Sequence, residues 1–262
     1  MEYILKNEQT LSEVLNVAQP FDIIYLENKT YYEKIKIIVD NITIIGTGPK
    51  SCIANKDYYN KIHADNKEYL TVRTYTVMVC GSNVTFKNLT IKNLSTPNSI
   101  YGQAVALHVL GDNFCCDNCK IYGAQDTILS GPIPYDLTIR YRNLLPQDEL
   151  SQKKSHQHYK NCLIAGDVDF IFGCGIAVFE DCQIHSLGKG YISAPSHPKE
   201  YPYGFVFINC QLTCEPNNVD NVYLARPWRD YGSSAFINCT IEKHSKKELE
   251  KSLNTKLKDK KV

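Results

Sequence analysis

Five polar residues stand at the edges of apolar, strand-like runs, a setting typical of either a satisfied buried ion pair or a tuned catalytic group. They are Gln103, Gln125, Asp126, Asp169 and Arg226. Two carboxyl groups can divide the work of a nucleophile and a general acid, and amide or guanidinium groups can stabilise developing negative charge. These residue types therefore suit acyl transfer, although their pattern alone does not exclude a structural ion pair.

The signatures of several other reactions are missing from the chain. There is no GxSxG, HExxH or GxxxxGK[ST] segment, and the seven histidines show no metal-ligand spacing. Cys116 and Cys119 would point to opposite faces of a strand, and no second CxxC follows them, so a zinc site is not expected. We predict a site that uses neither a metal nor a cofactor.

A repeated pattern of six consecutive residues indicates which elements position these side chains. Its positions are, in order, an aromatic residue or Cys, any residue, Asn or Asp, Cys or Leu, any residue, and an aliphatic residue. Its copies are Phe86–Ile91, Cys116–Ile121, Tyr159–Ile164, Phe179–Ile184, Phe207–Leu212 and Phe236–Ile241. Successive copies are 30, 43, 20, 28 and 29 residues apart, which is typical of one supersecondary unit per 20 to 30 residues. We interpret the 43-residue interval as containing one further copy of the repeat that the pattern does not detect.

Each repeat is too short to hold a strand, a helix and a strand, and alternation within it has the period of a β-strand. We therefore predict an all-β fold, a right-handed parallel β-helix with short helical caps. Residues at the same phase stack from coil to coil in such a fold, so the Asn and Cys positions are expected to form ladders along the interior.

The spacing of the five polar residues fits this arrangement. Gln103 and Gln125 are 22 residues apart, about one coil, whereas Asp126 and Asp169 are 43 residues apart, which we interpret as two coils. Asp169 and Arg226 are 57 residues apart, which also fits two coils. All five side chains are thus expected on one face of the solenoid.

A solenoid must close its open ends, and helical patterns occur at both ends of the chain. Thr10 to Glu13 form a capping-box sequence, followed by apolar residues at helical spacing up to Ala18. We predict an N-terminal capping helix within residues 1–20, a parallel β-helix domain over 21–242, and a lysine-rich helix or tail over 243–262.

The composition of the chain indicates which classes of binding partner and which cell compartment to expect. A net charge of +1 gives no reason to expect nucleic acid, and no run approaches the roughly 18 apolar residues of a membrane span, so neither partner is expected. The start of the chain shows no basic stretch followed by an apolar one, and the eleven cysteines are interpreted as buried reduced thiols. We expect a soluble, cytoplasmic monomer.

Four segments resemble, in order and approximate spacing, the signature motifs of pectin methylesterases. They are Gln103–Leu107, Gly123–Thr127, Gly166–Gly173 and Leu224–Trp228, and Tyr32-Glu33 is similar to a fifth, upstream element. The resemblance covers roughly residues 20–242. It implies the same β-helical fold, and removal of methyl esters from the galacturonate units of pectin or oligogalacturonates, with release of methanol.

The resemblance also implies a role for each polar residue. Asp169 is expected to be the nucleophile, and Asp126 the general acid and then the general base. Gln125 is expected to be the main oxyanion donor with help from Gln103, while Arg226 orients Asp169.

Four further residues are expected to contact the substrate. Trp228 would form the floor of a sugar subsite, and Thr71 falls where the family has a substrate-contacting threonine. Val168 and Phe172 would line the pocket for the methyl group and the sugar ring. Asp167 is interpreted as peripheral.

Three features depart from the family pattern. Ala225 replaces the usual Gly before Arg226, the chain ends shortly after Ile241, and the family is usually secreted. Two alternatives therefore stay open: a carbohydrate-binding β-helix with weak or no catalysis, and another pectin-active enzyme on this fold, a galacturonan hydrolase or lyase. A hydrolase needs two carboxylates across a glycosidic bond, and a lyase would gather several acids around calcium.

Overall fold

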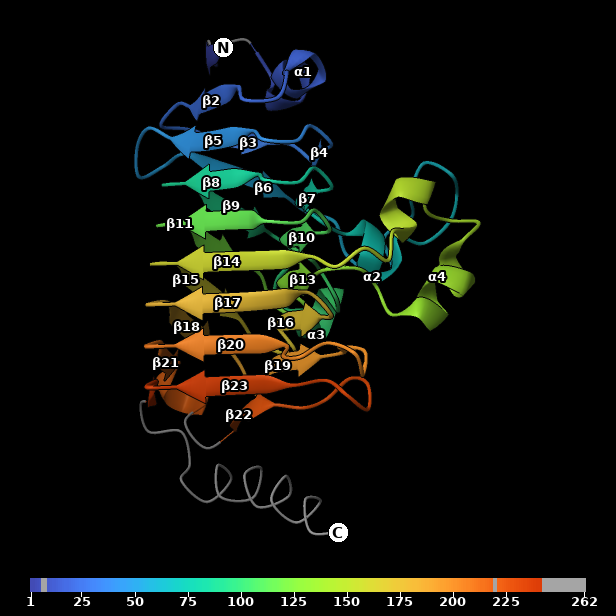
Figure 1. The fold of residues 1–262 in the computed structure, drawn as a ribbon, viewed down its shortest axis with the longest axis vertical. Coiled ribbons are helices and arrows are strands. Elements are labelled where there is room, and N and C mark those ends of the chain that lie inside the picture. Colours follow the sequence, from blue (N-terminus) through green and yellow to red (C-terminus); the bar gives the residue numbers. More distant parts are fainter. Residues whose placement is uncertain (6–8, 219–220, 242–262) are drawn as a thin grey trace.

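The chain forms a parallel β-helix, as the repeat predicts. The computed structural model describes residues 1–5, 9–218 and 221–241. Along these residues the chain visits three parallel sheets in turn, and each complete coil contributes one strand to sheet A, one to sheet B and one to sheet C (Figure 1). The predicted segment 243–262 lies outside the described residues.

The strands of each sheet follow the order of the coils. Sheet A contains β1 (Glu2–Ile4), β2 (Ile23–Leu26), β5 (Thr43–Gly46), β8 (Thr85–Lys87), β11 (Phe114–Asp117), β14 (His156–Lys160), β17 (Ile176–Glu180), β20 (Phe205–Ile208) and β23 (Ser234–Ile237). Sheet B contains β3 (Thr30–Tyr32), β6 (Cys52–Asn55), β9 (Thr90–Asn93), β12 (Lys120–Tyr122), β15 (Leu163–Gly166), β18 (Gln183–Ser186), β21 (Gln211–Cys214) and β24 (Thr240–Ile241). Sheet C contains β4 (Ile35–Ile37), β7 (Val77–Val79), β10 (Leu107–Val109), β13 (Ile128–Ser130), β16 (Ile171–Gly173), β19 (Gly190–Pro195) and β22 (Val222–Ala225).

The first position of the sequence repeat forms an aromatic stack inside the coils. The rings of Tyr159 and Phe179 are 4.8 Å apart, those of Phe179 and Phe207 are 4.7 Å apart, and Phe207 and Phe236 continue the stack at 4.6 Å. The Cys position of the repeat is also interior, since Cys119, Cys162, Cys182 and Cys210 are buried free thiols. Repetition in the sequence thus becomes a continuous core.

The Asn position of the repeat lies outside, and the expectation of an interior Asn ladder is wrong. These residues form the turn from sheet A to sheet B with a left-handed backbone: φ is 56° at Asn88, 51° at Asn118 and 53° at Asn161. Asn tolerates this conformation because its short polar side chain can bond locally. The ladder itself exists on the exposed surface, where the Asn118 amide donates to Asn88 Oδ1 at 2.8 Å.

The 43-residue step does not hide a missed copy. Strand β11 pairs directly with β14, so residues 118–160 make a single coil. The extra length is an excursion after β13 that carries helix α4 (Tyr135–Tyr141) and the 3₁₀ helix η1 (Gln147–Leu150), and it projects from the side of the solenoid (Figure 1). Neither helix was anticipated from the sequence.

The remaining helices are short. Helix α1 (Leu11–Val17) follows a capping box in which the Glu13 amide donates to Thr10 Oγ1 and the Thr10 amide donates to Glu13 Oε2. Helices α2 (Leu70–Arg73) and α3 (Asn98–Tyr101) and the 3₁₀ helix η2 (Pro216–Asn218) lie in connections between strands. None of the helices described in the structure has the length and apolar character needed to cross a membrane.

Candidate active site

A cleft of about 610 Å³ gathers eight of the nine predicted site residues. Those lining it are Thr71, Gln103, Gln125, Asp126, Asp169, Phe172, Arg226 and Trp228. The predicted Val168 is not part of the lining. Its side chain lies beside Gly190, and its carbonyl accepts a hydrogen bond from the Asp126 amide at 3.0 Å. The placement of Val168 in the substrate pocket stays a prediction, whereas its neighbour Asp169 is among the residues that line the cleft.

Pairing between coils brings the polar residues together. Gln103 and Gln125 form a parallel bridge, one coil apart as expected. Ile128 pairs with Ile171, so Asp126 and Asp169, each two residues earlier, lie on adjacent coils at a strand spacing of about 4.8 Å. The prediction of two coils between these aspartates is wrong because the intervening excursion leaves the solenoid. Asp169 and Arg226 are two coils apart, as predicted from their spacing.

Both aspartates have a left-handed backbone, with φ of 66° at Asp126 and 49° at Asp169. Each stands in the turn from sheet B to sheet C. This conformation is sparsely populated by non-glycine residues and is often found at functional sites, where the surrounding structure holds it in place. The hydrogen bond from the Asp126 amide to the Val168 carbonyl supplies part of that support.

Arg226 holds the carboxylate of Asp169 with two parallel hydrogen bonds. Its Nε donates to Asp169 Oδ1 at 2.9 Å, and its Nη2 donates to Asp169 Oδ2. The guanidinium also lies 4.9 Å from the ring centroid of Tyr191. A fork-to-fork pair of this kind fixes the orientation of the carboxylate, and the hydrogen bonds to Asp169 raise the pKa of Arg226.

Asp126 has the opposite environment. Its side chain is buried and makes no hydrogen bond within residues 1–5, 9–218 and 221–241. Burial raises the pKa of Asp126 well above its ordinary value, and the negative charge of Asp169 raises it further. The two carboxyls of this cleft therefore have different surroundings: Asp169 is paired with a guanidinium, whereas burial makes the Asp126 proton harder to lose.

Asp167 lies near this pair but outside the cleft lining. Burial raises its pKa to about 6, and its Oδ1 accepts a hydrogen bond from the Val168 amide at 2.7 Å. This position agrees with the interpretation of Asp167 as peripheral.

The two glutamine side chains offer free amide donors to the cleft. Neither Gln103 nor Gln125 makes a side-chain hydrogen bond to any residue that the structure describes, although both are half-buried. Their backbones are fixed, because the Ala104 amide donates to the Gln125 carbonyl at 3.1 Å and the Tyr59 amide donates to the Gln103 carbonyl at 3.0 Å. Preorganised neutral donors of this kind suit a developing oxyanion.

Aromatic and apolar side chains form the rest of the wall. The rings of Phe172 and Trp228 meet at 5.8 Å and 60°. The guanidinium of Arg229 lies 4.8 Å from the Trp228 ring, and its Nη2 donates to Asp136 Oδ2 at 2.8 Å. Asp136 belongs to helix α4, so the excursion is tied to the wall that carries Trp228.

Sequence reasoning missed the contribution of the excursion to the cleft. Four residues of α4 line it, namely Asp136, Leu137, Arg140 and Tyr141. The signal in the sequence was weak: Pro134 precedes the helix, and Leu137 and Tyr141 are four residues apart. A single helical turn of this kind did not indicate which part of the solenoid it would cover.

Among the described residues, no three His, Cys, Asp or Glu side chains gather in a group that could hold a metal ion. Fold and site together define a parallel β-helix protein with a carboxylate–guanidinium pair, a buried carboxyl and two amides in one cleft. This combination is suited to acyl transfer at an ester.

Comparison with known proteins identifies the family. The family model described as Pectinesterase matches residues 6–131 and 135–254. A probable pectinesterase/pectinesterase inhibitor of Arabidopsis thaliana is 31% identical over 255 residues, which cover 89% of this chain and 39% of that protein. The chain belongs to the pectinesterase family.

Solved structures agree with this assignment. The pectin methylesterase of Yersinia enterocolitica superposes with a TM-score of 0.75 at 28% identity, covering 90% of this chain and 80% of that one. A pectin methylesterase in complex with a hexasaccharide has a TM-score of 0.76 at 23% identity, covering 92% and 78%. The chain spans 39% to 56% of the length of the first curated relatives it matches.

Proposed function

We propose that this protein removes methyl esters from the galacturonate units of pectin or oligogalacturonates, releasing methanol. The observation that carries the proposal is the pair of aspartates in one cleft, with Asp169 bound by Arg226 and Asp126 buried without a hydrogen-bond partner among the described residues. Family membership and the hexasaccharide bound to a protein of the same fold support the choice of substrate.

The first half of the reaction transfers the acyl group to the enzyme. An oxygen of the Asp169 carboxylate attacks the ester carbonyl carbon, and the resulting oxyanion accepts hydrogen bonds from the Gln125 amide, with Gln103 assisting. As the tetrahedral intermediate collapses, Asp126 gives its proton to the departing methoxide, which leaves as methanol. The galacturonate is then held as an anhydride with Asp169.

The second half restores the enzyme. Asp126, now a carboxylate, takes a proton from a water molecule whose oxygen attacks the galacturonyl carbonyl of the anhydride. The anhydride bond to Asp169 breaks, which leaves the galacturonate as a carboxylic acid, Asp169 as a carboxylate and Asp126 protonated. The product acid then loses its proton to solvent. Arg226 holds the released carboxylate of Asp169 in the orientation that the next cycle needs.

Substrate binding uses the aromatic wall and a hydroxyl group of the cleft. Trp228 offers a flat apolar surface to a sugar ring, and its contact with Phe172 fixes its orientation. Thr71, on helix α2, also lines the cleft and offers a hydroxyl to the sugar.

Methanol release from highly methylated pectin tests the proposal. The purified protein should release methanol and acidify the medium, and Asp169→Asn should abolish both while the variant still binds the polymer. Shortened chains without methanol would instead indicate a hydrolase, unsaturated products would indicate a lyase, and binding without turnover by the unmodified protein would indicate a carbohydrate-binding β-helix.

We also propose that the protein works as a monomer in the cytoplasm. Support for a reducing compartment comes from the row of buried free thiols at Cys116, Cys119, Cys162, Cys182 and Cys210. Cell fractionation and sedimentation of the purified protein test the two statements separately.

A further inference from the structure

The backbone around Gln103 lies in an irregular stretch of sheet C. Gln103 forms an isolated bridge with Gln125, and strand β10 begins only four residues later. Within this stretch the Ala104 amide donates to the Gln125 carbonyl at 3.1 Å. The next amide, that of Val105, donates to a side chain, the Thr74 hydroxyl, at 2.9 Å. A hydroxyl group therefore holds the backbone two residues from the Gln103 side chain.

The same hydroxyl group is bound to helix α2. Thr74 directly follows this helix, and its Oγ1 donates to the Thr71 carbonyl at 2.7 Å. Because a hydroxyl has one proton to donate and lone pairs that accept, it can serve both partners at once. Thr71 and Gln103 both line the cleft. The Thr74 hydroxyl thus joins two segments of the cleft wall that are distant in the sequence.

A buried amide joins the same two segments a second time. Asn93, at the end of strand β9, is 2% exposed, and its Nδ2 donates to the carbonyls of Thr74 and Val105, each at 3.0 Å. The same nitrogen donates to the Asp57 carbonyl at 2.9 Å. Removal of the Thr74 hydroxyl should therefore shift the Val105 backbone without unfolding this region.

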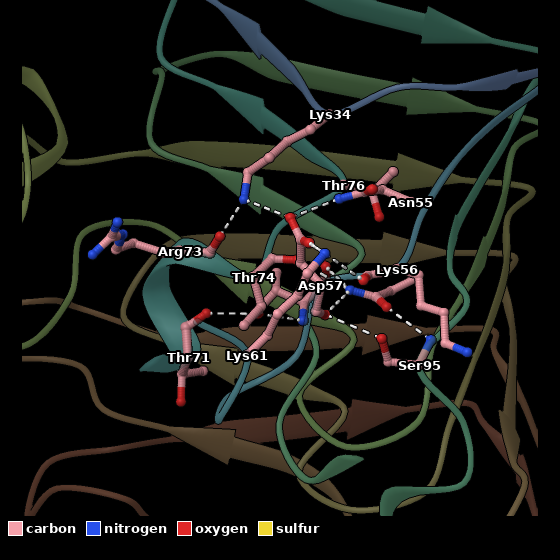
Figure 2. Close-up of polar contacts among 12 residues, drawn as sticks. Lys34, Asn55, Lys56, Asp57, Lys61, Thr71, Arg73, Thr74, Thr76 and Ser95 are labelled. Atoms are coloured by element: carbon pink, nitrogen blue, oxygen red, sulfur yellow. Dashed lines mark hydrogen bonds and ion pairs between the residues drawn. The ribbon is translucent and has the colours of Figure 1, made fainter. Parts of the chain in front are cut away.

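An ionic network fixes the end of helix α2 next to Thr74. Figure 2 shows Lys34 and Lys61 converging on Asp57, with Nζ to carboxylate distances of 2.9 Å and 2.6 Å. Lys34 also donates to the Arg73 carbonyl, at the last residue of the helix. The base from which the Thr74 hydroxyl reaches Val105 is therefore held in place.

We propose that Thr74 is a positioning residue of the active site, which fixes the Gln103 amide in the cleft through the Val105 backbone. The inference rests on the proposed function, in which Gln103 assists in binding the oxyanion. Such donors must be in place before the charge develops, and a small displacement weakens their effect steeply. The Thr71 carbonyl keeps a second bond, from the Thr74 amide at 3.2 Å, so loss of the hydroxyl acts mainly on Gln103.

Thr74→Val removes the hydroxyl group and keeps the branched shape of the side chain. This variant should lower kcat for methanol release about 10- to 100-fold, as a displacement of up to about 1 Å does, and should change KM little. Thr74→Ser retains the hydroxyl and should recover most of the rate. Equal kcat values of Thr74→Val and the unmodified protein would overturn the proposal.

Thr76→Val is the matched control. Thr76 is also fully buried, and its hydroxyl donates to the Lys92 carbonyl at 2.9 Å. Lys92 belongs to strand β9 and does not line the cleft. Both valine variants lose a buried hydroxyl bond and should unfold at lower urea concentrations, whereas only Thr74→Val should lower kcat. An equal loss of kcat in Thr76→Val would overturn the proposal.

A double-mutant cycle separates an effect through Gln103 from a general loss of structure. In the Gln103→Ala protein the donor is already absent, so the addition of Thr74→Val should change kcat by less than about threefold. A loss as large as that in the unmodified background would show that Thr74 does not act through Gln103.

Nuclear magnetic resonance tests the position of Gln103 without turnover. The side-chain amide signals of Gln103, identified by their absence from Gln103→Ala, should shift in Thr74→Val and stay unchanged in Thr76→Val. Unchanged signals in Thr74→Val would overturn the proposal, even if the unmodified protein releases methanol as the proposed function requires. If the signals shift but the unmodified protein releases no methanol, the proposed function fails and the link from Thr74 to Gln103 stands.

Discussion

Replacing Gln125 with Ala separates catalysis from stability in this protein. The amide of Gln125 faces the cleft and has no side-chain partner among the described residues, so the substitution removes a donor from the site without breaking a bond within that part of the fold. The backbone bond between the Ala104 amide and the Gln125 carbonyl does not depend on the side chain. Coil pairing at this position should therefore survive.

The expected magnitudes differ between the two properties. Loss of one oxyanion donor costs about 3–4 kcal/mol of transition-state stabilisation, which corresponds to a fall in kcat of about 10²- to 10³-fold. The half-buried side chain loses only part of its apolar contact, so the free energy of unfolding should fall by less than about 1 kcal/mol.

Methanol release at saturating pectin gives kcat, and urea unfolding gives the free energy of unfolding. Gln211→Ala is a matched control, because Gln211 is exposed on strand β21, in sheet B. A kcat within tenfold of the unmodified enzyme would refute the assignment of Gln125. A loss of stability large enough to explain the lost activity would refute the separation of the two effects.

Three further predictions concern charge. Asp126→Asn should lower kcat by about 10²-fold or more, as loss of a general acid does. The same substitution should also raise the free energy of unfolding at neutral pH. The pKa of Asp126 is raised on folding from its ordinary value of 3.8. The ionisable carboxyl therefore lowers the stability of the fold as pH rises from 3.8 through the folded pKa, and Asn lacks this carboxyl. Equal stability of the two proteins in urea at pH 7 would contradict this. Arg226→Lys should lower kcat/KM about 10- to 100-fold, because a lysine cannot reproduce the two parallel bonds to Asp169; near-normal activity would show that charge alone suffices. Finally, burial lowers the pKa of His108 from 6.5 to about 4. As pH drops from 6.5 to 4, the unfolded chain therefore binds a proton at this histidine before the folded chain does. The free energy of unfolding should fall by about 3 kcal/mol over this pH range. In urea unfolding, the free energy of unfolding of His108→Gln should depend less steeply on pH than that of the unmodified protein. An unchanged pH dependence would contradict this explanation.

The chain's local patterns determined much of this molecule. Aromatic and Cys positions alternate with exposed ones at the strand period, so the copies of the repeat predict strands whose interior faces stack, as Phe179 and Phe207 do. The types of Asp169, Asp126, Arg226 and the two glutamines indicated acyl transfer, and these five residues do share a cleft. Such inferences succeed because alternation and residue chemistry are properties of short segments.

Tertiary structure decided how the segments meet. Sequence spacing could not distinguish two coils from one coil with an excursion between Asp126 and Asp169, because only the hydrogen-bond register from β13 to β16 settles it. The same excursion brings Arg140 to the cleft, and the cleft is lined by Asp169 and not by its neighbour Val168. The turn that puts Asn118 outside depends on where strand β11 ends against its neighbours. Register between coils is a non-local property, since each strand is paired with residues 20 to 43 positions away.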